Sequence, residues 1–144
     1  MNLCNIKRTF ELLPIRKWST LYVLVDVHGV IIPGSWHDEN EFKFISKDCV
    51  EVLQWFTKRK DFRIILWTSS KESEIEKIAA WLVKHNIMVD YVNENPECQA
   101  APYADFSKKP YFNILIDDKA GFEPEKEWAE IKCQLIELGE WEKI

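Results

Sequence analysis

Six polar residues of the chain lie at or beside the ends of short apolar runs, where polar side chains of α/β proteins often meet a ligand. The five that follow an apolar run are Asp26, Thr68, Ser69, Asp117 and Asp118. The sixth, Lys109, precedes the last run. Two carboxylates about 4 Å apart repel each other by about 4 kcal/mol at an effective dielectric constant of about 20. A magnesium ion removes this repulsion, and it prefers carboxylate and phosphate oxygens as ligands.

A lysine and hydroxyl groups beside such an ion are suited to hold the oxygens of a phosphoryl group. Asp117 and Asp118 are then expected to bind the ion. Asp26 remains as an in-line nucleophile that forms an aspartyl phosphate. The residue types therefore predict magnesium-dependent phosphoryl chemistry.

The elements that must position these residues are strands and helices in alternation. Short apolar runs rich in Ile, Leu, Val and aromatic residues predict four buried strands, at 22–26, 63–67, 88–92 and 113–117. The strands are separated by helical patterns, except at segment 93–108, which contains two prolines and is expected to be a long surface connection without a helix.

Three helices are predicted from apolar residues at helical spacing. The stripes are Cys49, Val52, Leu53 and Phe56; Ile75, Ile78, Ala79 and Leu82; and Trp128, Ile131, Leu135 and Leu138. Ser46 is a candidate cap for the first helix, and Ser69 with Glu72 has the spacing of a capping box for the second. Pro124 suits the first turn of the third helix, and Gly139 is the expected stop.

Strands that alternate with helices predict an α/β fold with right-handed crossovers and a central parallel sheet. The expected architecture is a Rossmann-like three-layer α/β/α sandwich in one domain. Residues 1–20 form an edge element, residues 21–122 carry the core motifs and residues 123–144 carry the last helix. Ligands of such sheets bind outside the carboxyl ends of the strands, which brings the six polar residues to one edge.

The order of these residues resembles the motifs of the haloacid dehalogenase-like hydrolase superfamily. "DVHGV" is similar to the first motif, D-x-D-x-[T/V], with Asp26 at the nucleophile position and Val30 at the T/V position. "ILWTSS" is similar to the second motif at Thr68. "KKPYFNILIDDKAGF" is similar to the third and fourth motifs, at Lys109 and at the acidic pair.

The resemblance implies a role for each matched residue. Asp26 attacks phosphorus and also binds Mg²⁺, and the backbone carbonyl of His28 is a second metal ligand. Asp117 holds the ion directly or through water, with Asp118 assisting. The side chains that neutralise and orient the phosphoryl oxygens or bind the substrate are Thr68, Ser69 and Lys109.

The spacing of the motifs leaves no room for a full cap domain, which many members of that superfamily carry over the site. Only 41 residues separate Asp26 from Thr68, and 40 separate Thr68 from Lys109. We therefore expect an open site. Either a phosphorylated small molecule or a macromolecular phosphoester, such as a phosphoprotein or a nucleic-acid end, fits an open site.

His28 departs from the family pattern, which has a second acid at this position to protonate the leaving group and activate water. A histidine exchanges protons near neutral pH, so His28 is a candidate general acid and base. It is equally well explained as a buried, hydrogen-bonded histidine. An alternative function follows: a catalytically impaired phospholigand-binding or regulatory protein. A third hypothesis is dehalogenase-type attack of Asp26 on carbon, which needs no metal.

Composition narrows the class of protein. The net charge of −5 disfavours a broad grip on nucleic acid. No apolar run approaches the roughly 18 residues of a membrane helix, and the first residues lack the apolar stretch of a signal peptide. We therefore expect a cytoplasmic protein. Its four cysteines, Cys4, Cys49, Cys98 and Cys133, are then expected to be free thiols.

Overall fold

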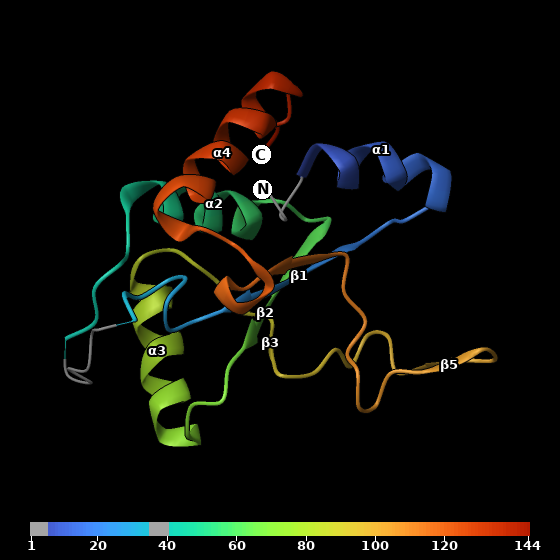
Figure 1. Cartoon of the computed structure of the whole chain (residues 1–144). Coiled ribbons are helices and arrows are strands. Elements are labelled where there is room, and N and C mark those ends of the chain that lie inside the picture. Colours follow the sequence, from blue (N-terminus) through green and yellow to red (C-terminus); the bar gives the residue numbers. More distant parts are fainter. Residues whose placement is uncertain (1–5, 35–40) are drawn as a thin grey trace.

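The computed structural model describes residues 6–34 and 41–144. Its centre is a four-stranded parallel sheet in the order β3-β2-β1-β6 (Figure 1). The strands are β1 (Leu21–Asp26), β2 (Phe62–Trp67), β3 (Tyr91–Val92) and β6 (Ile114–Ile116). Helices flank the sheet, so the predicted Rossmann-like α/β fold is confirmed.

The register of the central strands determines which residues reach the carboxyl edge together. β1 is apolar up to its last residue, as expected for a strand with neighbours on both sides. Asp26 pairs with Trp67 of β2, and Val25 pairs with Ile116 of β6. The residues that follow these strands therefore emerge beside Asp26.

In the described part of the chain, four α-helices accompany the sheet: α1 (Ile6–Arg16), α2 (Lys47–Lys58), α3 (Glu72–Lys84) and α4 (Pro124–Glu137). The hydroxyl of Ser46 caps α2 by accepting a hydrogen bond from the Cys49 N–H at 3.1 Å, as predicted. Pro124 occupies the first turn of α4, also as predicted. Leu138 follows the end of α4 rather than extending its buried stripe, and it is 36% exposed.

The two faces of the sheet are covered differently. Alternate strand residues, among them Val23, Val25 and Ile64, share one buried cluster with apolar residues of all four helices. The opposite cluster is built on Tyr22, Leu24 and Ile65. Among the described residues, it is covered by side chains of the β3–β6 connection, such as Cys98, Tyr111 and Phe112. The arrangement is consistent with three layers, in which this connection supplies the third.

Two sequence expectations for local structure are corrected. The strand predicted at 88–92 is paired only at Tyr91–Val92. The capping box of Ser69 with Glu72 is wrong: α3 begins at Glu72 and its N-cap residue is Lys71. The hydroxyls of the preceding loop take part instead in the polar contacts of the candidate site.

The connection between β3 and β6 contains no helix, as predicted. It forms a small antiparallel hairpin of β4 (Ala100–Ala101) and β5 (Ala104–Asp105), which projects from the body of the molecule (Figure 1). The described part of the N-terminal region is helix α1. It is fastened to α4 by an ion pair of Lys7 with Glu137 and by a hydrogen bond from the Lys7 N–H to Gln134.

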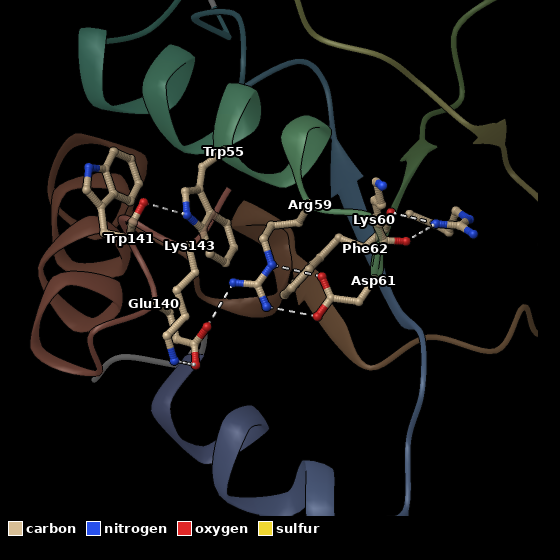
Figure 2. A network of polar contacts seen from close by, with 9 residues as sticks. Trp55, Arg59, Lys60, Asp61, Phe62, Glu140, Trp141 and Lys143 are labelled. Carbon is tan, nitrogen blue, oxygen red and sulfur yellow. Dashed lines mark hydrogen bonds and ion pairs between the residues drawn. The ribbon is translucent and has the colours of Figure 1, made fainter.

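A polar and aromatic network fastens the C-terminal segment to the end of α2 (Figure 2). The guanidinium of Arg59 donates two hydrogen bonds to Asp61, at 2.9 and 2.8 Å, and a third to Glu140 at 2.8 Å. It also lies 4.8 Å from the ring of Trp55, which stacks on Trp141. We call these five residues the Arg59 network.

Two further expectations concern thiols and membranes. Cys49, Cys98 and Cys133 are free, as predicted, and Cys4 lies outside the described residues. Over residues 6–34 and 41–144, the helices are too short or too polar to cross a membrane.

Candidate functional site

Three carboxylates meet at the carboxyl edge of the sheet. Asp26 ends β1, Asp117 directly follows β6, and Asp118 begins the short 3₁₀ helix η1 (Asp118–Ala120). One carboxylate oxygen from each residue lies within 4.8 Å of the other two. We call these three residues the acid triad. The fold thus brings Asp26 together with an acidic pair about 90 positions away in the chain, as the sequence predicted.

Backbone hydrogen bonds orient two of these carboxylates. Asp26 Oδ1 accepts a hydrogen bond from the Val27 N–H at 2.9 Å. Asp117 Oδ1 accepts one from the Lys119 N–H at 2.9 Å, which makes Asp117 the N-cap of η1. The local backbone therefore determines how both side chains face the third acid.

Burial and neighbouring charge act together on Asp26. Partial burial of Asp26 and the negative charge of Asp117 raise the pKa of Asp26 to about 6, against the lowering effect of the Val27 N–H. The protein thus disfavours the ionised form of a carboxylate that phosphoryl chemistry needs ionised. A hard divalent cation reverses this cost, and three converging carboxylate oxygens suit such an ion. The donor set therefore fits a magnesium-type ion without specifying which cation binds.

Gly29 makes room for Asp118, a constraint that sequence reasoning missed. Its φ of +86° lies in the left-handed region, which favours glycine. A Cβ atom at this position would lie 2.8 Å from Asp118 Oδ2. The turn after β1 is held from the other side by the Trp128 indole N–H, which donates to the Val30 carbonyl at 2.9 Å.

A pocket of about 420 Å³ opens beside the acid triad. Its described lining residues are Asp26, Trp67, Thr68, Ser69, Asn93, Asp117 and Lys119. Thr68 and Ser69 thus lie where the sequence placed them. Lys109 and Lys119 are both exposed, but only Lys119 is among these lining residues. The phosphate-binding role predicted for Lys109 remains a prediction, and Lys119 is a second candidate for it.

Asn93 fixes the loop after β2. Its side-chain oxygen accepts a hydrogen bond from the Thr68 N–H at 2.8 Å, and its amide nitrogen donates to the Thr68 carbonyl at 2.7 Å. The Thr68 hydroxyl is in turn bonded to Ser70, at 2.9 Å between the hydroxyl oxygens. Asn93 directly follows β3, so the rule that identified Thr68 after β2 would also have identified it.

The imidazole of His28 contacts a carboxylate from another element. Its Nε2 lies 2.6 Å from Oε1 of Glu74, in the first turn of α3. His28 is half-buried and is not among the described residues that line the pocket. The carbonyl ligand role predicted for His28 remains a prediction. Its hydrogen-bonded side chain fits the structural interpretation and also provides a defined ring orientation.

Comparison with known proteins gives the fold but no activity. Neither a protein-family model nor a curated protein matches the chain. The fold is similar to that of a conserved protein from Bacteroides thetaiotaomicron, with a TM-score of 0.61 and 22% sequence identity. The alignment covers 83% of this chain and 92% of that one. At this identity the similarity supports the parallel-sheet fold alone.

Proposed function

We propose that this chain is a magnesium-dependent phosphohydrolase of the haloacid dehalogenase-like type that works through an aspartyl phosphate. The observation that carries this proposal is the convergence of the acid triad beside a pocket that also contains hydroxyls and a lysine. A mere turn or helix cap explains an acidic pair, but it does not explain a third carboxylate from the central strand beside that pair.

The reaction takes place in two steps at Asp26. In the first, a carboxylate oxygen of Asp26 bonds to phosphorus while the ester P–O bond breaks and the leaving oxygen takes a proton from a general acid or from solvent. In the second, the oxygen of a water molecule bonds to phosphorus and its proton passes to a general base or to solvent. The bond between phosphorus and Asp26 then breaks, which releases inorganic phosphate and free Asp26. A bound magnesium ion would neutralise the phosphoryl oxygens, and Asp117 and Asp118 would hold it together with Asp26.

Polar residues around the pocket would orient the phosphoryl group. Thr68 and Ser69 place hydroxyls in the pocket wall, and Asn93 keeps the Thr68 backbone in position. Lys119 supplies a positive charge at the pocket, while Lys109 would have to reach the site from outside the described pocket lining. The pocket accepts a phosphomonoester whose remaining part extends into solvent, which suits a small molecule or a macromolecule.

The test is hydrolysis of p-nitrophenyl phosphate with and without Mg²⁺. We expect turnover that a chelator abolishes and that Asp26→Asn lowers by roughly 10³-fold or more, because the nucleophile is lost. Asp105→Asn, which removes an acid outside the triad, is the matched control and should keep full activity. Unchanged turnover in Asp26→Asn would refute the mechanism.

The histidine at position 28, where the resemblance expects a second acid, favours a second candidate, a phospholigand-binding protein without turnover. For that protein, Mg²⁺ with beryllium fluoride raises the melting temperature of the wild-type chain, but p-nitrophenyl phosphate is not hydrolysed. Measurable magnesium-dependent hydrolysis excludes it.

A further inference from the structure

One carboxylate oxygen connects the loop after β1 with the loop after β2. Glu74 Oε1 lies 2.6 Å from His28 Nε2 and 3.4 Å from the hydroxyl oxygen of Ser70. Ser70 is bonded to the hydroxyl of Thr68, which lines the pocket. A continuous polar chain therefore extends from the pocket wall to the imidazole.

The contact between His28 and Glu74 specifies which ring nitrogen is engaged. An ionised carboxylate accepts hydrogen bonds only, so a proton must lie on His28 Nε2 to make the 2.6 Å contact favourable. In the neutral ring this leaves Nδ1 unprotonated and able to accept a proton. A carboxylate that fixes a histidine tautomer in this way is a recurrent element of enzyme active sites.

The pair lies close to the acid triad through the chain itself. His28 is two residues beyond Asp26, and the next residue, Gly29, packs against the Asp118 carboxylate. Glu74 comes from α3, and its side chain is 20% exposed. Glu72 lies in the same first turn of α3 but is exposed, so the position of an acid in this turn does not by itself produce the contact.

We propose that Glu74 is a positioning residue that holds His28 with Nδ1 free to take the proton of the hydrolytic water. This inference rests on the proposed function. In the second step the water oxygen bonds to phosphorus, the bond between phosphorus and Asp26 breaks, and the water proton moves to Nδ1. Glu74 and His28 together then supply the acid–base function that the resemblance assigns to a carboxylate at position 28.

The kinetic experiment follows p-nitrophenol release from p-nitrophenyl phosphate in Glu74→Ala. Because p-nitrophenolate leaves without needing a proton, the first step stays fast and only the second step slows. We expect kcat to fall about 10- to 100-fold, with a burst of p-nitrophenol that approaches one per chain. Glu74→Gln, whose amide oxygen still accepts from Nε2, should recover part of the rate.

Glu72→Ala is the matched control, because it removes an equal charge from the same turn of α3. It should leave kcat unchanged, because the exposed Glu72 is not part of the polar chain from the pocket wall to His28. The double variant His28→Ala with Glu74→Ala should be no slower than His28→Ala alone, because Glu74 acts through the imidazole. Additive losses in the double variant would overturn the inference.

A spectroscopic readout tests the geometry without turnover. Proton–nitrogen NMR correlations of the imidazole, assigned with His28→Ala, should show a fixed Nε2–H tautomer in the wild type and a tautomer mixture in Glu74→Ala. An unchanged His28 spectrum in Glu74→Ala overturns the inference. Wild-type turnover with unaltered Glu74→Ala kinetics overturns this inference alone. A wild type without turnover overturns it together with the proposed function.

Discussion

Two clusters of partly buried charged side chains among the described residues are balanced in opposite ways. In the Arg59 network, one guanidinium faces two carboxylates at hydrogen-bond distance (Figure 2). In the acid triad, three carboxylates face one another, and one lysine, Lys119, is among the described residues that line the pocket beside them. The first cluster is complete within the chain, and the second calls for a cation from outside.

The pKa shifts of the two clusters express this difference. Hydrogen bonds from Arg59 to Asp61 and Glu140 raise the pKa of the guanidinium, so folding favours its charged form. Burial and the charge of Asp117 raise the pKa of Asp26 to about 6, so folding disfavours its charged form. A cluster of the first kind stabilises a fold, whereas one of the second kind reduces stability and is explained by a ligand.

Gly29→Ala is expected to affect the acid triad and to leave the Arg59 network unchanged. The new Cβ atom would displace the Asp118 carboxylate, so we expect phosphatase activity to fall roughly 100-fold, in line with the loss of a group in the catalytic machinery. Activity is measured at saturating Mg²⁺, and binding of the ion by calorimetry.

Gly139→Ala provides the control for backbone strain. Gly139 also has a positive φ, of +71°, but a Cβ atom there has open space around it. This variant should lose about 1 kcal/mol of stability and keep its activity. Equal activity in the two glycine variants would show that the contact with Asp118 is irrelevant to the site.

Arg59→Leu should have the reverse effect, on stability and not on activity. It leaves Asp61 and Glu140 without their shared cation, and both are partly buried. We expect the free energy of unfolding to fall by about 2 kcal/mol and the melting temperature by roughly 4–8 °C, measured by chemical and thermal denaturation. At low temperature its kcat should match the wild type; a selective loss of activity would mean that the two clusters are coupled.

A smaller effect distinguishes the two lysines. Lys119 lines the pocket and Lys109 does not, so we expect Lys119→Ala to raise KM for p-nitrophenyl phosphate about 10-fold. Lys109→Ala, an equal change at a residue outside the described pocket lining, should alter KM by less. The reverse order would assign the phosphate contact to Lys109, as the motif resemblance implies.

The sequence predicted the parts of the fold and site that depend on periodicity and strand ends. Apolar runs identified the buried strands, and the rule for the carboxyl edge brought Asp26 and Asp117 together across about 90 residues. The same rule, applied to β3, would have identified Asn93. These successes share one cause: a parallel sheet turns sequence position at a strand end into position in space.

What the sequence could not show depends on side-chain direction. The contact of His28 with Glu74 joins two elements whose relative orientation is determined only by packing. The room that Gly29 leaves for Asp118 depends on a backbone angle that residue type permits without requiring. Likewise, the pattern of the motifs did not indicate that Lys119 lines the pocket.

A cation site at the acid triad is tested most directly by the melting temperatures of the wild type and Asp26→Asn across pH, with and without Mg²⁺. Because folding raises the pKa of Asp26, the metal-free wild type should lose stability relative to Asp26→Asn as pH rises from about 4 through about 6. Since this carboxyl is half exposed, solvent screening limits the gap to roughly 2–4 °C at about pH 7.5.

Added Mg²⁺ should close this gap by raising the melting temperature of the wild type more than that of Asp26→Asn. A wild type whose melting temperature does not change with Mg²⁺ would contradict a cation site at the acid triad. So would an equal rise in the melting temperature of Asp26→Asn.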